Sequence, residues 1–233
     1  MKISVNQKLI SRNKKISQVV LYLAIGLIVL GIILTISNPG SAQNLIVYLI
    51  LIPAYLLIQI NALMANRWGK SPRMDEIVTR ALKGLDDRYS LYHYTTAVAH
   101  LLVGPMGVII IKPYPQYGEI SFDNHRHKFI QKGGGNLLTK FLSQDSLPDI
   151  QRESKRAQSD LINYLKRIGL FEYPEPQVVN IFYHEQVKLQ TQNSPVVIMR
   201  DEKIKDYIRQ LTKQKFVPEK QLQTLLSKLP VVE

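Results

Sequence analysis

The sequence predicts an α/β domain, with a mixed sheet flanked by helices, that follows a hairpin of two transmembrane helices. Two uncharged apolar stretches near the N-terminus are each long enough to cross a hydrocarbon core of about 30 Å. Beyond them, patterns typical of helices and strands succeed one another in the order helix, three strands, helix, strands, helix. That order is typical of a layered α/β sandwich.

The apolar stretches span residues 16–36 and 44–64, with a basic segment at 1–15 and a linker at 65–72. Lys and Arg residues flank the pair of stretches, and the turn between them carries no charge. Because cationic flanks stay in the cytoplasm, we expect a multi-pass protein of the inner (cytoplasmic) membrane with both termini cytoplasmic. The lipid bilayer is then a partner through residues 16–64. A signal peptide cleaved near Ala42 is the alternative, and it leaves the large domain on the same side.

The chain is strongly basic and contains no cysteine. Lys and Arg outnumber Asp and Glu by 30 to 18, and residues 65–233 alone hold 25 cations against 18 acids. This balance favours an anionic partner such as nucleic acid or acidic lipid. The lack of cysteine excludes disulfides, cysteine-ligated zinc and thiol catalysis.

The domain at 73–233 begins with an amphipathic helix that opens on Asp75 and Glu76, where acids suit the helix dipole. Residues 91–104 and 107–112 are rich in β-branched and aromatic side chains and are predicted to be paired strands. Gly118–Phe122 alternates and is predicted to be the third strand. The segment 124–146, which contains three consecutive glycines, is expected to be rich in loops.

A long helix is predicted from Asp149, with Ala157, Leu161, Leu165 and Ile168 on its apolar face. Short strands are predicted over 177–184, 187–190 and 195–199, and closing helices over 201–215 and 218–229.

The order of these elements and four motifs resemble the NERD domain, the nuclease-related domain of the PD-(D/E)xK restriction-endonuclease-like superfamily. The motifs are "DEIVTRAL", "HLLVGPMGVIIIK", "YGEI" and "PDIQRESKRAQSDLINYL". Over roughly residues 73–211, the resemblance implies a restriction-endonuclease-like mixed sheet. It matches Glu76 to the helix glutamate of the family, His100 to the strand histidine and Gln151 to the glutamine of the last motif.

The resemblance also implies a degenerate catalytic motif. A metal-dependent nuclease needs acids to hold Mg²⁺ and a lysine beside the attacking water. Here the strand aspartate of the family falls on Ala99, and its Glu-x-Lys motif falls on Ile111–Pro113. Lys112 stands one place before the family lysine, which turns its side chain to the other face of the strand. We therefore expect no catalysis at the usual site and no cofactor.

A rearranged site would have to use other residues. Glu76, Lys112 and Gln151 are the remaining catalytic candidates. Candidate Mg²⁺ ligands for such a nuclease are Glu76, Glu119 and Asp123, although acids at strand ends and in first helical turns are usually solvated. The histidines His93, His100 and His184 are scattered along the sequence, and His100 is expected to be a packed strand histidine.

Basic residues of the long helix suggest a surface for phosphates, joined by Lys128 and Lys132 in the preceding segment. The alternative is a solvated helix face. The helix residues are Arg152, Lys155, Arg156, Lys166 and Arg167.

The leading functional prediction is a membrane-anchored, catalytically inactive NERD-like domain with a binding or scaffolding role, most testably nucleic-acid binding. One alternative is a metal-dependent nuclease with a rearranged site that uses Mg²⁺. The other is a protein-interaction subunit of a membrane complex, whose partner is an unidentified membrane or cytoplasmic protein.

Overall fold

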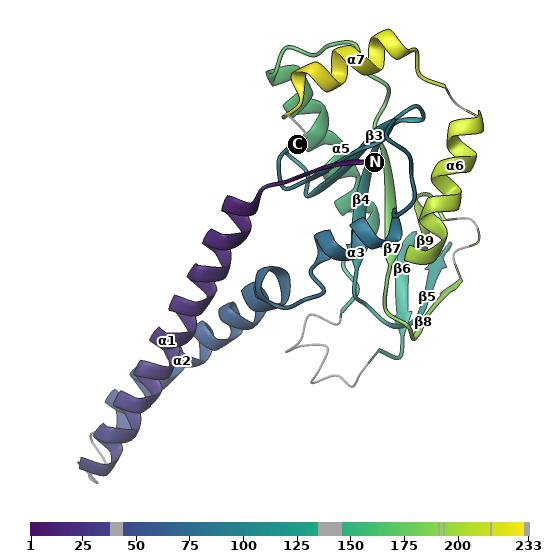
Figure 1. Ribbon diagram of the computed structural model, residues 1–233. Helices are drawn as coiled ribbons and strands as arrows, with labels where there is room; N and C mark the ends of the chain where they lie inside the picture. The colour runs from purple at the N-terminus through teal and green to yellow at the C-terminus, as the bar shows by residue number, and fades with distance from the viewer. Residues whose placement is uncertain (38–43, 135–145, 191, 193, 215, 231–233) are drawn as a thin grey trace. The chain divides into compact units, whose positions relative to one another are not determined.

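The chain forms two compact units, Gln7–Arg73 and a larger unit that combines Met1–Asn6 with Met74–Glu233. The computed structural model describes residues 1–37, 44–134, 146–190, 192, 194–214 and 216–230 (Figure 1). The larger unit is a mixed α/β structure with helices on a mixed sheet, which confirms the predicted fold class at that level.

The smaller unit is a pair of helices, α1 (Gln7–Ser37) and α2 (Asn44–Met64), followed by a π-helical turn (Ala65–Gly69). By length and composition, both helices could cross a membrane. Helix α1 starts well before the expected apolar boundary because Lys and Arg are good helix formers. Charged Lys and Arg side chains mark the boundary of a membrane-spanning stretch, but they do not end the helix.

Small side chains allow α1 and α2 to pack closely. Ala24 and Ala54 are fully buried, and a Cβ added at Gly31 would lie 3.1 Å from the Leu51 side chain. Ser17, Ala24 and Gly31 repeat at the seven-residue spacing of interhelical packing. The Ser17 hydroxyl donates a hydrogen bond to the side-chain oxygen of Asn61 at 2.7 Å. This seven-residue repeat of small residues is the feature of the sequence that indicates the packing of α1 against α2.

A six-stranded sheet forms the centre of the larger unit, in the order β1-β2-β3-β4-β7-β9. Strands β2, β3 and β4 form an antiparallel meander, whereas β1 is parallel to β2, β7 is parallel to β4, and β9 is parallel to β7. The strands are β1 (Lys2–Val5), β2 (Ser90–His93), β3 (His100–Gly104), β4 (Gly107–Tyr114), β7 (Gln177–Phe182) and β9 (Val197–Arg200).

A second sheet of three strands has the order β6-β5-β8. The predicted third strand is β5 (Gly118–Asp123), and it pairs with β6 (Lys128–Lys132) and β8 (Val187–Gln190), outside the main sheet. Gly118 has φ +91°, and a Cβ there would meet the Lys132 carbonyl oxygen at 2.6 Å, so the chain can turn out of the main sheet only at a glycine. Strand β6 lies within the segment expected to be rich in loops. Residues 135–145 of that segment, including the third glycine, lie outside the described residues.

The stretch 91–104, predicted to be one strand, is two strands joined by a tight connection. Tyr94 adopts φ +58° directly after β2, and its amide donates to the Ala99 carbonyl at 2.8 Å. The chain therefore reverses, and His93 pairs with His100 across the hairpin. Residue types that favour strands continue through the turn, so the sequence pattern did not reveal the turn.

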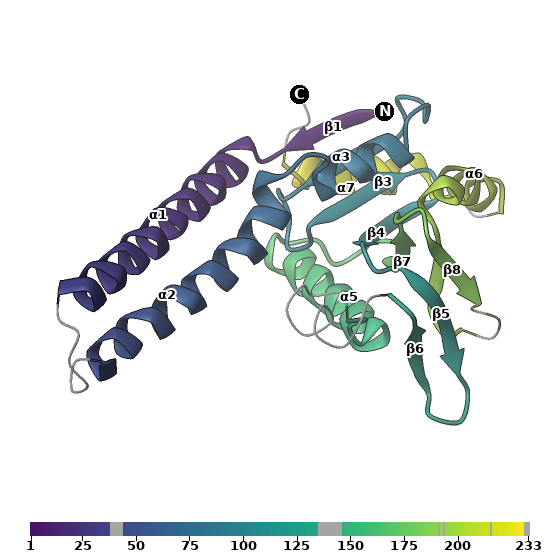
Figure 2. The same cartoon turned by 90° about the horizontal axis from the view of Figure 1, so that it is seen from below.

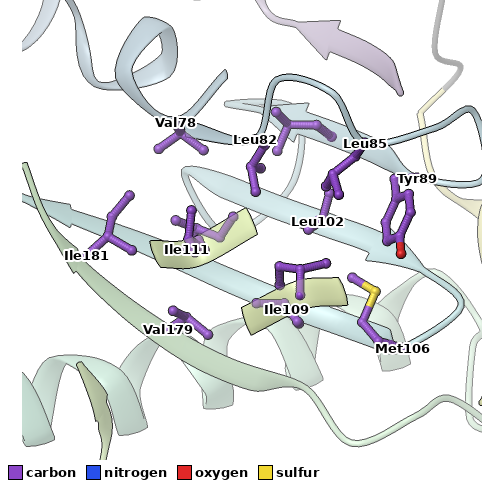
Figure 3. Close-up of a cluster of buried hydrophobic side chains, with 13 residues drawn as sticks. Val78, Leu82, Leu85, Tyr89, Leu102, Met106, Ile109, Ile111, Val179 and Ile181 are labelled. Carbon is purple, nitrogen blue, oxygen red and sulfur yellow. The ribbon is translucent and has the colours of Figure 1, made fainter. Parts of the chain in front are cut away.

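Helices cover both faces of the main sheet. Helices α3 (Met74–Ala81) and α6 (Ile204–Gln214) contribute to one core cluster together with Ile109 and Ile111 of β4 (Figure 3). The opposite cluster combines α5 (Ile150–Arg167) and α7 (Glu219–Lys228) with Val108 and Ile110. Figure 2 shows α3 and α5 on opposite sides of β3 and β4. Alternate residues of β4 thus serve different cores.

The predicted apolar face of α5 is confirmed. Leu161 and Leu165 are fully buried, and Ala157 and Ile168 pack against the same cluster. Asp149 caps the helix by accepting from the Arg152 amide at 3.0 Å.

Strand β1 occupies part of the segment expected to be a charged flank. The Lys2 amide donates to the Tyr89 carbonyl at 2.9 Å, and the Asn6 amide donates to the His93 carbonyl at 3.0 Å. Met1 and Ile3 pack against the core cluster under α3. The first residues are therefore part of the larger unit.

Candidate functional site

A buried polar cluster lies where the end of β2 and the start of β3 meet α3. The Nδ1 atoms of His93 and His100 are 2.8 Å apart, and His93 Nε2 is 2.9 Å from the Thr79 hydroxyl oxygen. Both imidazoles are almost completely buried, as is Asp75 in the first turn of α3. The three side chains Thr79, His93 and His100 therefore form a continuous hydrogen-bonded chain.

This chain needs one proton between the two Nδ1 atoms, so one imidazole donates and the other accepts. Burial lowers the pKa of His93 to about 4, against the opposing effect of the Asp75 carboxylate. His93 is therefore neutral at pH 7. The expectation that His100 is a packed strand histidine is confirmed, whereas the view of His93 and His100 as scattered is wrong, because the hairpin brings them together.

Apolar packing surrounds Ile111, one of the two positions at which the resemblance led us to expect a lost carboxylate. Ile111 is 1% exposed and packs with Val78 and Leu82 at α3 (Figure 3). Neither Ile111 nor Ala99 has a side-chain atom that could bind a metal ion. Glu76 lies on α3 at the same face of the sheet and is half-buried.

Lys112 points to the opposite face, toward α5, so Glu76 and Lys112 do not come together. Its ammonium is 2.7 Å from the Glu153 carboxylate, 41 residues away in sequence. The Tyr114 hydroxyl donates to the same carboxylate oxygen at 2.9 Å. Burial raises the pKa of the Tyr114 phenol above its usual range, and Glu153 adds to the rise. A lysine, a carboxylate and a buried phenol thus satisfy one another.

Sequence reasoning missed Glu153 as the partner of Lys112. The available signal was helical spacing: Glu153, Ala157, Leu161 and Leu165 recur every fourth residue, so Glu153 heads the stripe that faces the sheet. Thr79, His93 and His100 were also missed as a cluster, because the approach of the two histidines depends on the β2–β3 turn.

The other two candidate metal ligands, Glu119 and Asp123, have neighbouring lysines or hydrogen-bond donors. Within the described ranges, no group of three or more His, Asp or Glu residues is arranged to hold a metal ion. Glu119 is registered between Lys132 and Lys188 on the neighbouring strands. Asp123 accepts from the amides of Arg126 and His125, and these hydrogen bonds hold its pKa below the usual value.

The basic residues of α5 share one exposed face. All five predicted cations are exposed, and the helix carries them over about 22 Å from first to last. Among them, Arg156 lies 4.0 Å from Asp160, and Arg167 lies over the Tyr164 ring. The five are Arg152, Lys155, Arg156, Lys166 and Arg167, which we call the α5 basic face.

The β5–β6 hairpin adjoins the first turn of α5. Gln151 Nε2 donates to the His127 carbonyl at 3.2 Å, which is the role that the structure gives this glutamine. The exposed Arg126 and Lys128 of the hairpin therefore extend the cationic surface past the helix, as expected for Lys128. Lys132 is also exposed, at the far end of β6.

No family model, curated protein or solved structure matches this chain.

Proposed function

We propose that this protein is a membrane-anchored, catalytically inactive NERD-like domain that binds nucleic acid through the α5 basic face. The observation that carries the proposal is the set of five exposed cations on one side of a single helix. Such a surface attracts phosphates through counterion release and does not require base contacts.

The order of elements supports a restriction-endonuclease-like core. Helix α3 precedes the antiparallel β2-β3-β4 meander, and α5 leads to β7, which is parallel to β4. The NERD resemblance implies a helix, three strands, a helix and a strand. Its three strands correspond to β2 with β3 (predicted as one strand), β4 and β5, and of these β5 pairs outside the main sheet. Two strands of the second sheet, β5 and β6, lie between β4 and α5 in sequence, and its third strand, β8, lies between β7 and β9.

The chemistry of the site supports inactivity. A divalent metal needs oxygen ligands, and the motif positions carry Ala99 and Ile111. Lys112 is neutralised by Glu153 on the far face of the sheet. Within the part of the chain that the structure describes, no convergent set of carboxylates accompanies the buried histidines under α3.

The membrane part of the proposal follows from α1, α2 and the charges beside them. Helices of this length and hydropathy suit a bilayer, and their cationic flanks favour a cytoplasmic location for both termini. Nucleic acid would then meet the domain at the inner face of the membrane.

The test uses the full chain in nanodiscs of zwitterionic lipid, mixed with labelled duplex DNA or RNA over a salt series, with and without Mg²⁺. Five phosphate contacts predict a slope of log affinity against log salt of about −4.5. The double variant K155Q/R156Q should lower that slope by about 2. Its matched control, K213Q/K220Q, removes the same charge from exposed positions of α6 and α7 and should leave binding unchanged.

Three results would contradict the proposal. Equal losses in both double variants would mean that net charge, and not the α5 basic face, determines binding. Mg²⁺-dependent cleavage that disappears in Glu76→Gln would establish an active rearranged site. A lack of any binding would direct the search to a protein partner.

A further inference from the structure

The edge of β2 is occupied by a strand that comes from the other side of the membrane hairpin in sequence. Lys2, Ile3, Ser4 and Val5 pair with Ser90–His93 in parallel register. The Asn6 side-chain amide also donates to the Tyr94 carbonyl at 3.1 Å, across 88 residues of sequence. Because so long a segment separates β1 from β2, their pairing resembles the docking of a separate peptide more than the formation of a local hairpin.

The pairing is built from both backbone and side chains. Hydrogen bonds from the Lys2 and Asn6 amides fix the two ends of the strand. Ile3 packs into the core cluster that also holds Leu91, its register partner. Ile3 thus inserts a side chain into the core while the backbone of β1 pairs with β2, as in strand addition to a sheet edge.

We infer that the β2 edge is a strand-binding site whose occupant is residues 2–5 of the same chain, and that it is filled only when both segments lie on the same face of the membrane. The hairpin of Gln7–Arg73 is then an insertion within the α/β unit rather than an appendage at its end. This inference concerns the sheet edge and is independent of what the α5 basic face binds.

The strand also covers the polar cluster. Val5 is registered opposite His93, and Asn6 hydrogen-bonds the His93 backbone. Helix α1 begins at Gln7, so Asn6 alone separates the strand from the helix. A displacement of β1 therefore uncovers the edge beside His93, and α1 is the element attached to that strand.

The lack of natural cysteine allows a direct test in the full chain. The pair Lys2→Cys and Ser90→Cys joins two register partners, and the matched control joins Lys2→Cys to Ser121→Cys in the other sheet. Oxidation in isolated membranes should give an intramolecular disulfide at least about tenfold faster in the first pair. Equal rates in the two pairs would overturn the strand placement.

Mixed expression of the two single-cysteine chains distinguishes the source of the strand. Little covalent dimer is expected, and dimer as the main product would overturn the assignment to the same chain. A second variant pair tests the backbone: Lys2→Pro removes the amide donor, whereas Lys2→Ala removes only the side chain. Amide protection of β2 should fall about fivefold in the proline variant relative to the alanine variant. Equal protection would contradict the docking of β1.

Discussion

Acidification from pH 7 to pH 5 should destabilise the α/β unit through His93. This side chain is fully buried, with a pKa of about 4 against an ordinary value of 6.5. Between these values the unfolded chain binds a proton that the folded chain does not, so the free energy of unfolding falls as the pH falls. The complete effect is about 3 kcal/mol, of which about 2 kcal/mol is lost between pH 7 and pH 5. Well below pH 4, where His93 is protonated in both states, this group contributes no further loss.

The measurement is amide hydrogen exchange of the full chain in detergent micelles, corrected for the intrinsic pH dependence of exchange. Amides of β2 and β3 should lose about thirtyfold in protection at pH 5 relative to pH 7, which corresponds to 2 kcal/mol at about 0.59 kcal/mol for RT. The single tryptophan, Trp68, lies in the other compact unit, so its fluorescence does not report on this transition.

His93→Gln is the decisive variant because glutamine does not titrate. It should be less stable than the natural protein at pH 7, since Thr79 and His100 lose a well-placed partner. Its protection should nevertheless stay constant between pH 7 and pH 5. The control His125→Gln changes an exposed hairpin histidine and should keep the natural pH dependence. The same slope in His93→Gln and in the natural protein would refute the argument.

Three further predictions concern packing and can be checked by chemical denaturation or thermal melting. Glu153→Ala should lower stability by about 1–3 kcal/mol, because the buried Tyr114 hydroxyl loses its acceptor, while Glu153→Gln should recover part of this loss. Equal losses in the two variants would contradict that role of the acceptor. Gly31→Val should weaken α1–α2 packing by about 1–3 kcal/mol, whereas Gly26→Val, where a Cβ meets nothing within 4 Å, should not. Similar effects at both glycines would exclude the close helix contact as the cause. Ile111→Glu should cost about 3–5 kcal/mol by burying an unpaired charge, and a variant of natural stability would show that this core tolerates a carboxylate.

Local patterns of the sequence were sufficient for much of the fold. The four-residue recurrence of Leu161 and Leu165 identified the buried face of α5, and the β-branched residues of the run 107–112 identified β4. The one-place shift of Lys112 also predicted correctly that its side chain leaves the Ile111 face. These features depend only on the period of a single helix or strand.

The features that were missed depend on contacts between distant segments. Strand β1 has four residues, too few for a period to be recognised, and its partner is defined only by the folded sheet. The ion pair of Lys112 crosses 41 residues. The approach of His93 and His100 required the positive φ of Tyr94, a conformation that non-glycine residues seldom adopt and that residue type does not signal.

Strand β1 also has a consequence for the timing of synthesis. Asn6 leaves the ribosome 88 residues before its partner Tyr94. At elongation rates of about 5–20 residues per second, the strand waits about 4–18 s for that partner, with both apolar helices made in the interval. During this wait its backbone amides have only water or a chaperone to bind. The last hydrogen bonds of the sheet edge thus form after the helices have emerged. The domain can therefore be completed only if residues 2–6 have stayed close enough to pair with β2.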